Sequence, residues 1–329
     1  MRFLFVMDPL AGVSVTADTT FALMLAAQER GHEPWYCTVA DLWVKDGAAH
    51  ARAARASVRA VQGEHYVLAP AEELPLAAFE AVWMRKDPPF DISYVLATYP
   101  LDVAGTLVVN HPAALRDANE KMFGTRFPAL GPRTLVTRSP ARLRAFLAEL
   151  GGRMIVKPLD GMGGLGVLLL RADDPNLPSL IELCTATGRQ WLMAQEYLPA
   201  AARGDKRILL LDGEPLGAIL RVPPPGEIRG NIHIGASVVA TELDHDDRRI
   251  CDALAPALRA HGLWFVGLDV IGGKLTEVNV TSPTGIQELT RLGGGRPTHA
   301  VVDWLEKHPF GRGIDPALIP AAAADSAAS

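Results

Sequence analysis

A glycine-rich stretch between two strand-like runs is the feature that most constrains this chain. Residues 157–167 read KPLDGMGGLGV, in which Gly161, Gly163 and Gly166 have the G-x-G-x-x-G spacing of a dinucleotide-binding turn. A Rossmann turn requires a helix directly after its glycines, whereas VLLLRA follows here and is typical of a strand. The stretch also lacks the Gly-Lys-Ser/Thr of a P-loop. The pattern therefore predicts a strand, a glycine loop and a second strand.

Two interpretations of this loop remain open from the residues themselves. Glycines let backbone N–H groups approach phosphate oxygens closely, and Lys157 at the end of the first strand would add a positive charge. An ordinary flexible hairpin loop would contain the same glycines, because short glycine motifs are weak signals.

Composition excludes several classes of protein. The 329 residues suffice for two or three domains, and a hydrophobic fraction of 49% supports a sizeable core. With a net charge of −5 and no long basic tract, neither nucleic acid nor membrane is an expected partner. Three cysteines that lie far apart predict a reducing, cytoplasmic location rather than disulfides or zinc. The first apolar run, residues 3–7, is too short for a signal peptide or a membrane span.

The first 110 residues alternate short apolar runs with a helical pattern. The helix is predicted over 18–31, with Asp18 or Thr19 as its N-cap and Gly31 just past its end. Such alternation favours a doubly wound, parallel sheet. The predicted strands are 3–7, 35–39, 81–84 and 106–110.

The remainder of the chain mixes helices with hairpins. Asp212-Gly213 predicts a tight turn within a hairpin over 206–222, and the proline- and glycine-rich residues 223–237 predict a mobile loop. The tail 317–329 is expected to be disordered. The other predicted elements are helices over 112–123, 139–152 and 246–261, and strands over 153–158, 166–172, 191–198, 264–271 and 275–280.

The last hairpin carries oxygen-bearing side chains that could bind a metal ion. Glu277 and Asn279 are two residues apart on one strand and so share a face. A two-residue turn at 272–273 would place Asp269 opposite Thr276, whereas a three-residue loop would place it opposite Glu277. We predict the three-residue loop, because three oxygen ligands on one face form a Mg²⁺ site. A solvated outer face with a stray acid is the alternative.

Together these motifs resemble the ATP-grasp superfamily. More closely, the chain resembles the bacterial glutathione synthetases along nearly its whole length, most specifically in MRKDPPFD, VKPLDGMGG and EVNVTSPTGIQE. The resemblance implies an α/β ATP-grasp fold with nucleotide held between its last two domains. It implies an N-terminal doubly wound domain over 1–118, a central lid domain over 119–200, and a C-terminal α+β domain over 201–316 that includes the mobile loop.

The resemblance also implies which residues bind the nucleotide and metal. Two lysines would hold the phosphates under the glycine loop, backbone groups of a hinge would bind adenine, and an aspartate would face the ribose. The implied ATP-binding set is Lys121, Lys157, Gly161, Met162, Gly163, Gly164, Glu196, Tyr197, Leu198 and Asp205. Two Mg²⁺ ions, which Mn²⁺ can replace, would be held by Asp269, Glu277 and Asn279.

The implied activity is ATP-dependent ligation of γ-glutamylcysteine to glycine through an acyl phosphate, in a cytoplasmic homotetramer. Arg207, Arg221 and Arg229 would be the cationic set near the γ-phosphate, because a guanidinium fork suits a carboxylate or an acyl phosphate. Ser282 and Thr284 would bind the peptide substrate.

Two other functions remain open for a chain with these motifs. Another ATP-grasp ligase could join a different acid and amine at the same nucleotide site. A nucleotide-binding regulator that has lost catalysis is disfavoured, because such a protein has little reason to keep the metal-binding residues together with Lys121 and Lys157.

Overall fold

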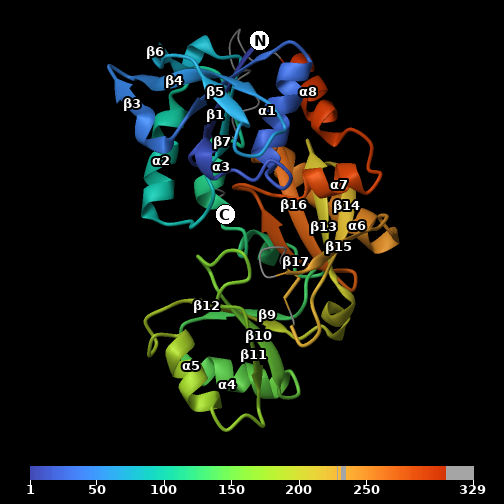
Figure 1. The fold of residues 1–329 in the computed structure, drawn as a ribbon. Coiled ribbons are helices and arrows are strands. Elements are labelled where there is room, and N and C mark those ends of the chain that lie inside the picture. Colours follow the sequence, from blue (N-terminus) through green and yellow to red (C-terminus); the bar gives the residue numbers. More distant parts are fainter. Residues whose placement is uncertain (228, 231–234, 309–329) are drawn as a thin grey trace, which may run out of the picture.

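The computed structural model describes residues 1–227, 229–230 and 235–308 of the 329. It contains three β-sheets, two of which pack together while the third forms a separate lobe (Figure 1). The predicted tail 317–329 and part of the predicted loop 223–237 lie outside the described residues. Short 3₁₀ helices occur at Leu10–Gly12, Val39–Asp41, Leu76–Ala78, Phe123–Arg126 and Pro199–Arg203.

The N-terminal sheet has the strand order β3-β4-β2-β1-β7-β8. Four strands are parallel and lie within two residues of their predicted positions: β1 (Arg2–Met7), β2 (Glu33–Cys37), β7 (Ala81–Arg85) and β8 (Leu107–Val109). The sequence analysis did not predict four antiparallel strands that extend it: β3 (Leu42–Lys45), β4 (Ala48–Val58), β5 (Tyr66–Leu68) and β6 (Glu72–Pro75). The longest, β4, reads AAHARAARASV, and alanine is a strong helix former that is depleted in strands. Strand β4 pairs with β2, β3, β5 and β6, and burial of its alanines in this sheet outweighs that local preference.

Helices cover this sheet, and the first and the last of them pack against each other. Asp18 caps α1 (Thr19–Glu29), as predicted, by accepting a hydrogen bond from the Phe21 amide. The last helix, α8 (Pro297–Lys307), packs against α1 (Figure 1), and Arg30 forms ion pairs with Asp303 and Glu306 there. The other helices on this sheet are α2 (Ile92–Asp102) and α3 (Pro112–Asp117).

Helix α3 is shorter than the predicted 112–123. It ends at Asp117, and the Asn119 side chain then accepts hydrogen bonds from the amides of Lys121 and Met122. Asparagine side chains compete in this way with helical hydrogen bonds. The result is a tight turn that presents Glu120 and Lys121 outside a regular helix.

The second sheet forms a lobe with its own core (Figure 1). Ser139 and Pro140 start a helix as predicted, with the Ser139 hydroxyl accepting from the Arg142 amide. The antiparallel order is β11-β10-β12-β9. Its elements are β9 (Thr134–Thr137), α4 (Pro140–Glu149), β10 (Arg153–Pro158), β11 (Leu168–Arg171), α5 (Leu177–Cys184) and β12 (Leu192–Glu196).

The third sheet packs against the N-terminal one through shared hydrophobic cores. The Asn110 side chain connects the two sheets, because it forms hydrogen bonds with backbone groups of Phe265 and Val280. The antiparallel order is β15-β14-β13-β16-β17. Its elements are β13 (Asp205–Leu211), β14 (Glu214–Val222), β15 (Ser237–Ala240), α6 (His245–Ala260), β16 (Phe265–Ile271), β17 (Lys274–Asn279) and α7 (Ile286–Arg291).

The loop that joins β16 and β17 is shorter than the sequence analysis predicted. Ile271 pairs with Lys274, so the loop has two residues rather than the predicted three. The strands nevertheless place Asp269 opposite Glu277, because an irregularity next to Asp269 inserts Thr276 as an extra residue. The Thr276 hydroxyl donates to the Asp269 carbonyl at 3.1 Å. The predicted pairing is therefore correct, and the predicted loop length is wrong.

Candidate active site

A cavity of about 630 Å³ opens where the three sheets meet. It brings together every residue that the sequence predicted for the site, from segments that lie far apart along the chain. These are Lys121, Lys157, Gly161, Met162, Gly163, Gly164, Glu196, Tyr197, Leu198, Asp205, Arg207, Arg221, Arg229, Asp269, Glu277, Asn279, Ser282 and Thr284.

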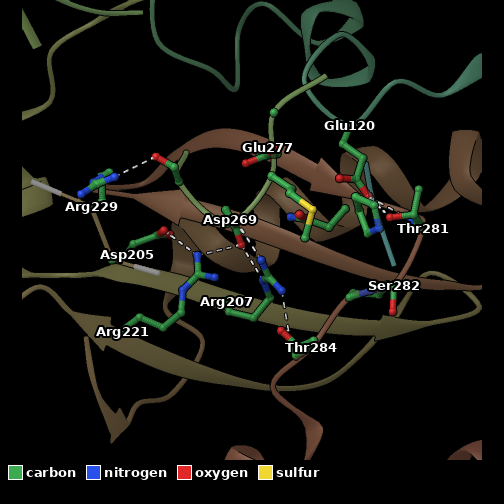
Figure 2. A pocket seen from close by; sticks show the side chains of 18 of the residues that line it. Glu120, Asp205, Arg207, Arg221, Arg229, Asp269, Glu277, Thr281, Ser282 and Thr284 are labelled. Atoms are coloured by element: carbon green, nitrogen blue, oxygen red, sulfur yellow. Dashed lines mark hydrogen bonds and ion pairs between the residues drawn. The ribbon is translucent and has the colours of Figure 1, made fainter. Parts of the chain in front are cut away.

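A buried charge network forms the floor of the cavity (Figure 2). Arg207 donates to both oxygens of Asp269, from Nε at 2.5 Å and from Nη2 at 3.0 Å. Arg221 lies between two carboxylates, with Nη2 at 3.1 Å from Asp269 and hydrogen-bonded to Asp205. The arrangement is two guanidiniums shared by two carboxylates, so the network is internally balanced.

The pKa values of the two carboxylates in this network are shifted in opposite directions. Burial alone would raise the pKa of Asp269, but the guanidiniums of Arg207 and Arg221 outweigh burial and lower it. Burial raises the pKa of Asp205 to about 6, although Arg221 opposes that change. Within the described residues, Asp205 Oδ1 and Arg221 Nε are buried without a hydrogen-bond partner. Such orphaned polar atoms in a cavity mark where a polar ligand can bind.

Two lysines from different segments line the cavity, Lys121 in the turn after α3 and Lys157 on β10. Lys121, only 5% exposed, places Nζ at 3.2 Å from Glu277 Oε1 and donates to the Gly161 carbonyl at 2.5 Å. In the described part of the chain the Lys157 ammonium has no hydrogen bond or ion pair, and burial lowers its pKa while Glu277 opposes the change. A half-buried ammonium without a partner is available to an anionic ligand.

The glycine loop joins β10 to β11 and needs its glycines. Gly163, Gly164 and Gly166 have φ of 60°, 81° and 74°, which disfavour other residues. A Cβ on Gly161 would lie 2.7 Å from the Pro158 ring. Arg229 Nη1 donates to the Gly164 carbonyl at 3.1 Å, which connects this loop to the segment after β14.

The predicted hinge follows the end of β12. The Glu196 amide donates to the Arg133 carbonyl at 2.9 Å, which fixes the strand end. The Arg153 guanidinium lies 5.3 Å from the centroid of the Tyr197 ring. Asp205, predicted near a ribose, is engaged by Arg221 on the cavity floor.

Sequence models of known families match most of the chain. The model for the N-terminal domain of prokaryotic glutathione synthetase matches residues 1–116, and the model for the ATP-grasp domain of the same family matches residues 120–294. The chain belongs to the prokaryotic glutathione synthetase family. The predictions of this family, of the ATP-grasp fold and of an ATP-dependent ligase are thereby confirmed.

Relatives of this glutathione synthetase family align over nearly the full length. The chain is 48% identical to the glutathione synthetase of Thermosynechococcus vestitus over 317 residues, which are 93% of this chain and 99% of that protein. It is 47% identical to the glutathione synthetase of Shewanella oneidensis, over 86% of this chain and 91% of that protein.

Solved structures share the fold at low sequence identity. D-cycloserine synthetase DcsG superposes with a TM-score of 0.65 at 19% identity, over 92% of this chain and 99% of that one. A RimK domain ATP-grasp protein from Sphaerobacter thermophilus superposes with a TM-score of 0.61 at 18% identity, over 92% and 99%. Among residues 1–227, 229–230 and 235–308, no helix combines the length and hydropathy of a membrane span.

The sequence analysis did not assign several charged residues that line the cavity, among them Glu120 and Arg85. Glu120 Oε1 accepts three hydrogen bonds, from the amides of Val280 and Thr281 and from the Thr281 hydroxyl (Figure 2). Burial and the negative charge of Glu277 raise its pKa. The buried Arg85 donates to the Thr20 hydroxyl and to the Pro283 carbonyl. Arg85 stands inside MRKDPPFD, one of the motifs that carried the resemblance, and this was the available signal.

The donor set of the β16–β17 hairpin fits a hard divalent cation. Two carboxylates and one amide oxygen face the same cavity, and Mg²⁺ prefers oxygen ligands. Asn279 donates through Nδ2 to the Gly267 carbonyl at 3.1 Å, which leaves its Oδ1 as the acceptor. Within the described ranges, no cluster of three or more His, Cys, Asp and Glu side chains is suited to a metal, and the third oxygen donor on this hairpin is the amide of Asn279.

Proposed function

We propose that the protein ligates γ-glutamylcysteine to glycine and converts ATP to ADP and phosphate. The observation that carries this proposal is the convergence of Lys121, Lys157, the glycine loop and the β16–β17 hairpin on one cavity. Family membership and relatives at 48% and 47% identity that are named glutathione synthetase support the same substrates.

In this proposal the nucleotide lies between the second and third sheets. Lys121, Lys157 and amides of the glycine loop neutralise and orient the phosphates, while the hinge at 196–198 binds adenine. Asp269, Glu277 and Asn279 would hold two Mg²⁺ ions, which Mn²⁺ could replace, and these ions would neutralise charge at the phosphates.

The chain positions reactants rather than supplying a nucleophile. A carboxylate oxygen of the dipeptide takes the γ-phosphoryl group, and the P–O bond to ADP breaks. The glycine amine then attacks the acyl carbon, loses a proton, and phosphate leaves with the former carboxylate oxygen. Arg207, Arg221 and Arg229 lie where they can hold the anionic groups, and Ser282 and Thr284 line the substrate side. Oriented reactants can contribute about 7–11 kcal/mol to such a step.

Three domains serve these roles in the proposal. Residues 1–118 bind peptide, 119–200 form the lid, and 201–316 carry the metal-binding hairpin. Closure of the glycine loop together with the loop 223–237 would keep water from the acyl phosphate. We place the enzyme in the cytoplasm as a homo-oligomer.

Two measurements test the reaction. Phosphate release from ATP should require γ-glutamylcysteine and glycine together, and glutathione should form in equal amount. With ¹⁸O in the dipeptide carboxylate, labelled phosphate should appear. Unlabelled phosphate would exclude the acyl phosphate route, whereas turnover only with another acid or amine would indicate a different ATP-grasp ligase. Nucleotide binding without any turnover would indicate a non-catalytic regulator.

A further inference from the structure

The segment that joins the first 3₁₀ helix to α1 forms part of the cavity wall. Four of its residues line the cavity: Gly12, Val13, Ser14 and Ala17. In the described chain, residues 13–18 belong to no helix or strand, so their backbone groups need hydrogen-bond partners from elsewhere. We name residues 12–17 the wall loop.

Gln62, in the connection between β4 and β5, holds the wall loop from the N-terminal domain. Its Oε1 accepts a hydrogen bond from the Val15 amide at 3.0 Å, and its Nε2 donates to the Val13 carbonyl at 3.1 Å. A primary amide both donates and accepts, so one glutamine satisfies an N–H group and a C=O group of the loop together.

Gln287 on α7 holds the same loop from the other side of the chain. Its Nε2 donates to the Val15 carbonyl at 3.1 Å and to the Asp18 carbonyl at 2.6 Å. Helix α7 packs against α1, which follows the wall loop (Figure 1). Val15 is only 7% exposed, and its amide and its carbonyl are bound by two different glutamines. Neither glutamine is among the described residues that line the cavity, so both act through the loop.

The neighbourhood of the wall loop favours a substrate that carries carboxylates. Arg85 donates to the Thr20 hydroxyl at 3.0 Å and to the Pro283 carbonyl at 3.1 Å. It thereby joins the start of α1 to the segment that contains Ser282 and Thr284, which also line the cavity. Among the residues that the structure describes, the buried Arg85 guanidinium forms hydrogen bonds but no ion pair. A guanidinium in this state suits a carboxylate ligand.

We propose that Gln62 and Gln287 are positioning residues for the dipeptide, because they fix the wall loop against which it binds. This inference rests on the proposed function, since it assigns one of the proposed substrates to the loop. Loss of either glutamine leaves a backbone group of the buried Val15 without its partner and gives the loop more conformational freedom. A less ordered wall weakens binding of the substrate that it contacts and leaves the phosphate-binding groups unchanged.

Steady-state kinetics of Gln62→Ala and Gln287→Ala test this proposal, with γ-glutamylcysteine, glycine and ATP each varied in turn. We expect the KM for γ-glutamylcysteine to rise by roughly three- to tenfold, which corresponds to about one net hydrogen bond. The kcat and the KM values for glycine and ATP should stay at the wild-type level, because only binding of the dipeptide is weakened.

Gln28→Ala is the matched control. Gln28 pairs with Val58 as Gln62 pairs with the wall loop, since it donates to the Val58 carbonyl at 2.8 Å and accepts from the Val58 amide at 2.9 Å. Neither Gln28 nor Val58 is among the described cavity-lining residues. The control therefore loses the same kind of pairing and should keep every wild-type KM.

Hydrogen exchange gives a second readout that does not depend on activity. The Val15 amide should exchange faster in Gln62→Ala than in the wild type, because it has lost its acceptor. In Gln28→Ala its exchange should be unchanged.

Four outcomes would overturn the proposal. They are a wild-type KM for γ-glutamylcysteine in both variants, an equal rise in KM for all three substrates, an equal rise in the Gln28→Ala control, and unchanged exchange of the Val15 amide in Gln62→Ala. Absence of ligation by the wild type would instead contradict the proposed function, so the two failures are distinguishable.

Discussion

Arg207 on β13 lies directly opposite Asp269 on β16, and its guanidinium donates to both oxygens of that carboxylate. The pair is almost fully buried, with side chains 7% and 6% exposed. One arginine thus fixes the orientation of the predicted metal-binding carboxylate. Removing one member of a buried pair leaves an uncompensated charge, and this gives the first prediction.

Arg207→Ala should lower the free energy of unfolding by about 3 kcal/mol, the low end for a buried pair, because Arg221 still contacts Asp269. Urea unfolding of the variant and wild type measures the difference. Arg171→Ala is the control, since Arg171 forms an exposed pair with Asp173 and should unfold like the wild type. Equal stability of the Arg207 variant and the wild type would contradict the prediction.

Titration of Asp205 should lower the free energy of unfolding as the pH rises from about 4 to about 6. Burial raises its pKa from 3.8 to about 6, so in this window the folded chain holds a proton that the unfolded chain has lost. The contribution is at most about 3 kcal/mol across the window, at 1.36 kcal/mol per unit of pKa. Unfolding free energies of the wild type and Asp205→Asn, compared at several pH values, should differ in slope. Parallel curves would show that Asp205 does not titrate there.

Glu120 should matter as a hydrogen-bond acceptor that positions Lys121. Glu120→Ala leaves the amides of Val280 and Thr281 without their acceptor, at a cost of about 1–3 kcal/mol, and should raise the KM for ATP. Glu120→Gln keeps an oxygen at this place and should be milder in both unfolding and KM. If the two variants were equally impaired, the charge of Glu120 rather than its acceptor oxygen would be the important property.

Asn279→Ala should raise the Mg²⁺ concentration needed for half-maximal activity by roughly tenfold or more, because it removes one of three oxygen donors. Asn279→Asp keeps the oxygen and should be less affected. Titration of Mg²⁺ into enzyme stripped with EDTA measures both. Asp173→Asn, a change of an exposed acid outside the cavity, is the control. An unchanged Mg²⁺ requirement in Asn279→Ala would exclude this residue as a ligand.

Local rules predicted much of the fold because they act over a few residues. The Asp18 and Ser139 caps follow from side chains that bond nearby amides. The tight turn at Asp212 and Gly213, with φ of 51° and 76°, follows from residues that tolerate positive φ. Each of these features was therefore visible in a short window of the sequence.

Features that depend on distant partners were not predictable in this way. The extra residue Thr276 is held by a hydrogen bond to Asp269 on the opposite strand. This extra residue shifts the pairing by one position, as the predicted third loop residue would have done. The pairing of Asp269 with Glu277 was therefore predicted correctly although the predicted loop was one residue too long. Strand β4 is alanine-rich and becomes a strand only between its neighbours. Glu120 contacts residues about 160 positions away, and nothing adjacent to it indicates that contact.

Lys121 has one further consequence, through its bond to the Gly161 carbonyl. The ammonium anchors the glycine loop to the turn after α3. An arriving triphosphate thus meets a loop whose conformational freedom is already reduced, and little entropy remains to be lost on association. The Gly161 carbonyl can also accept a hydrogen bond from the Lys121 ammonium after ADP departs. Product release therefore does not leave this buried ammonium without a hydrogen-bond partner.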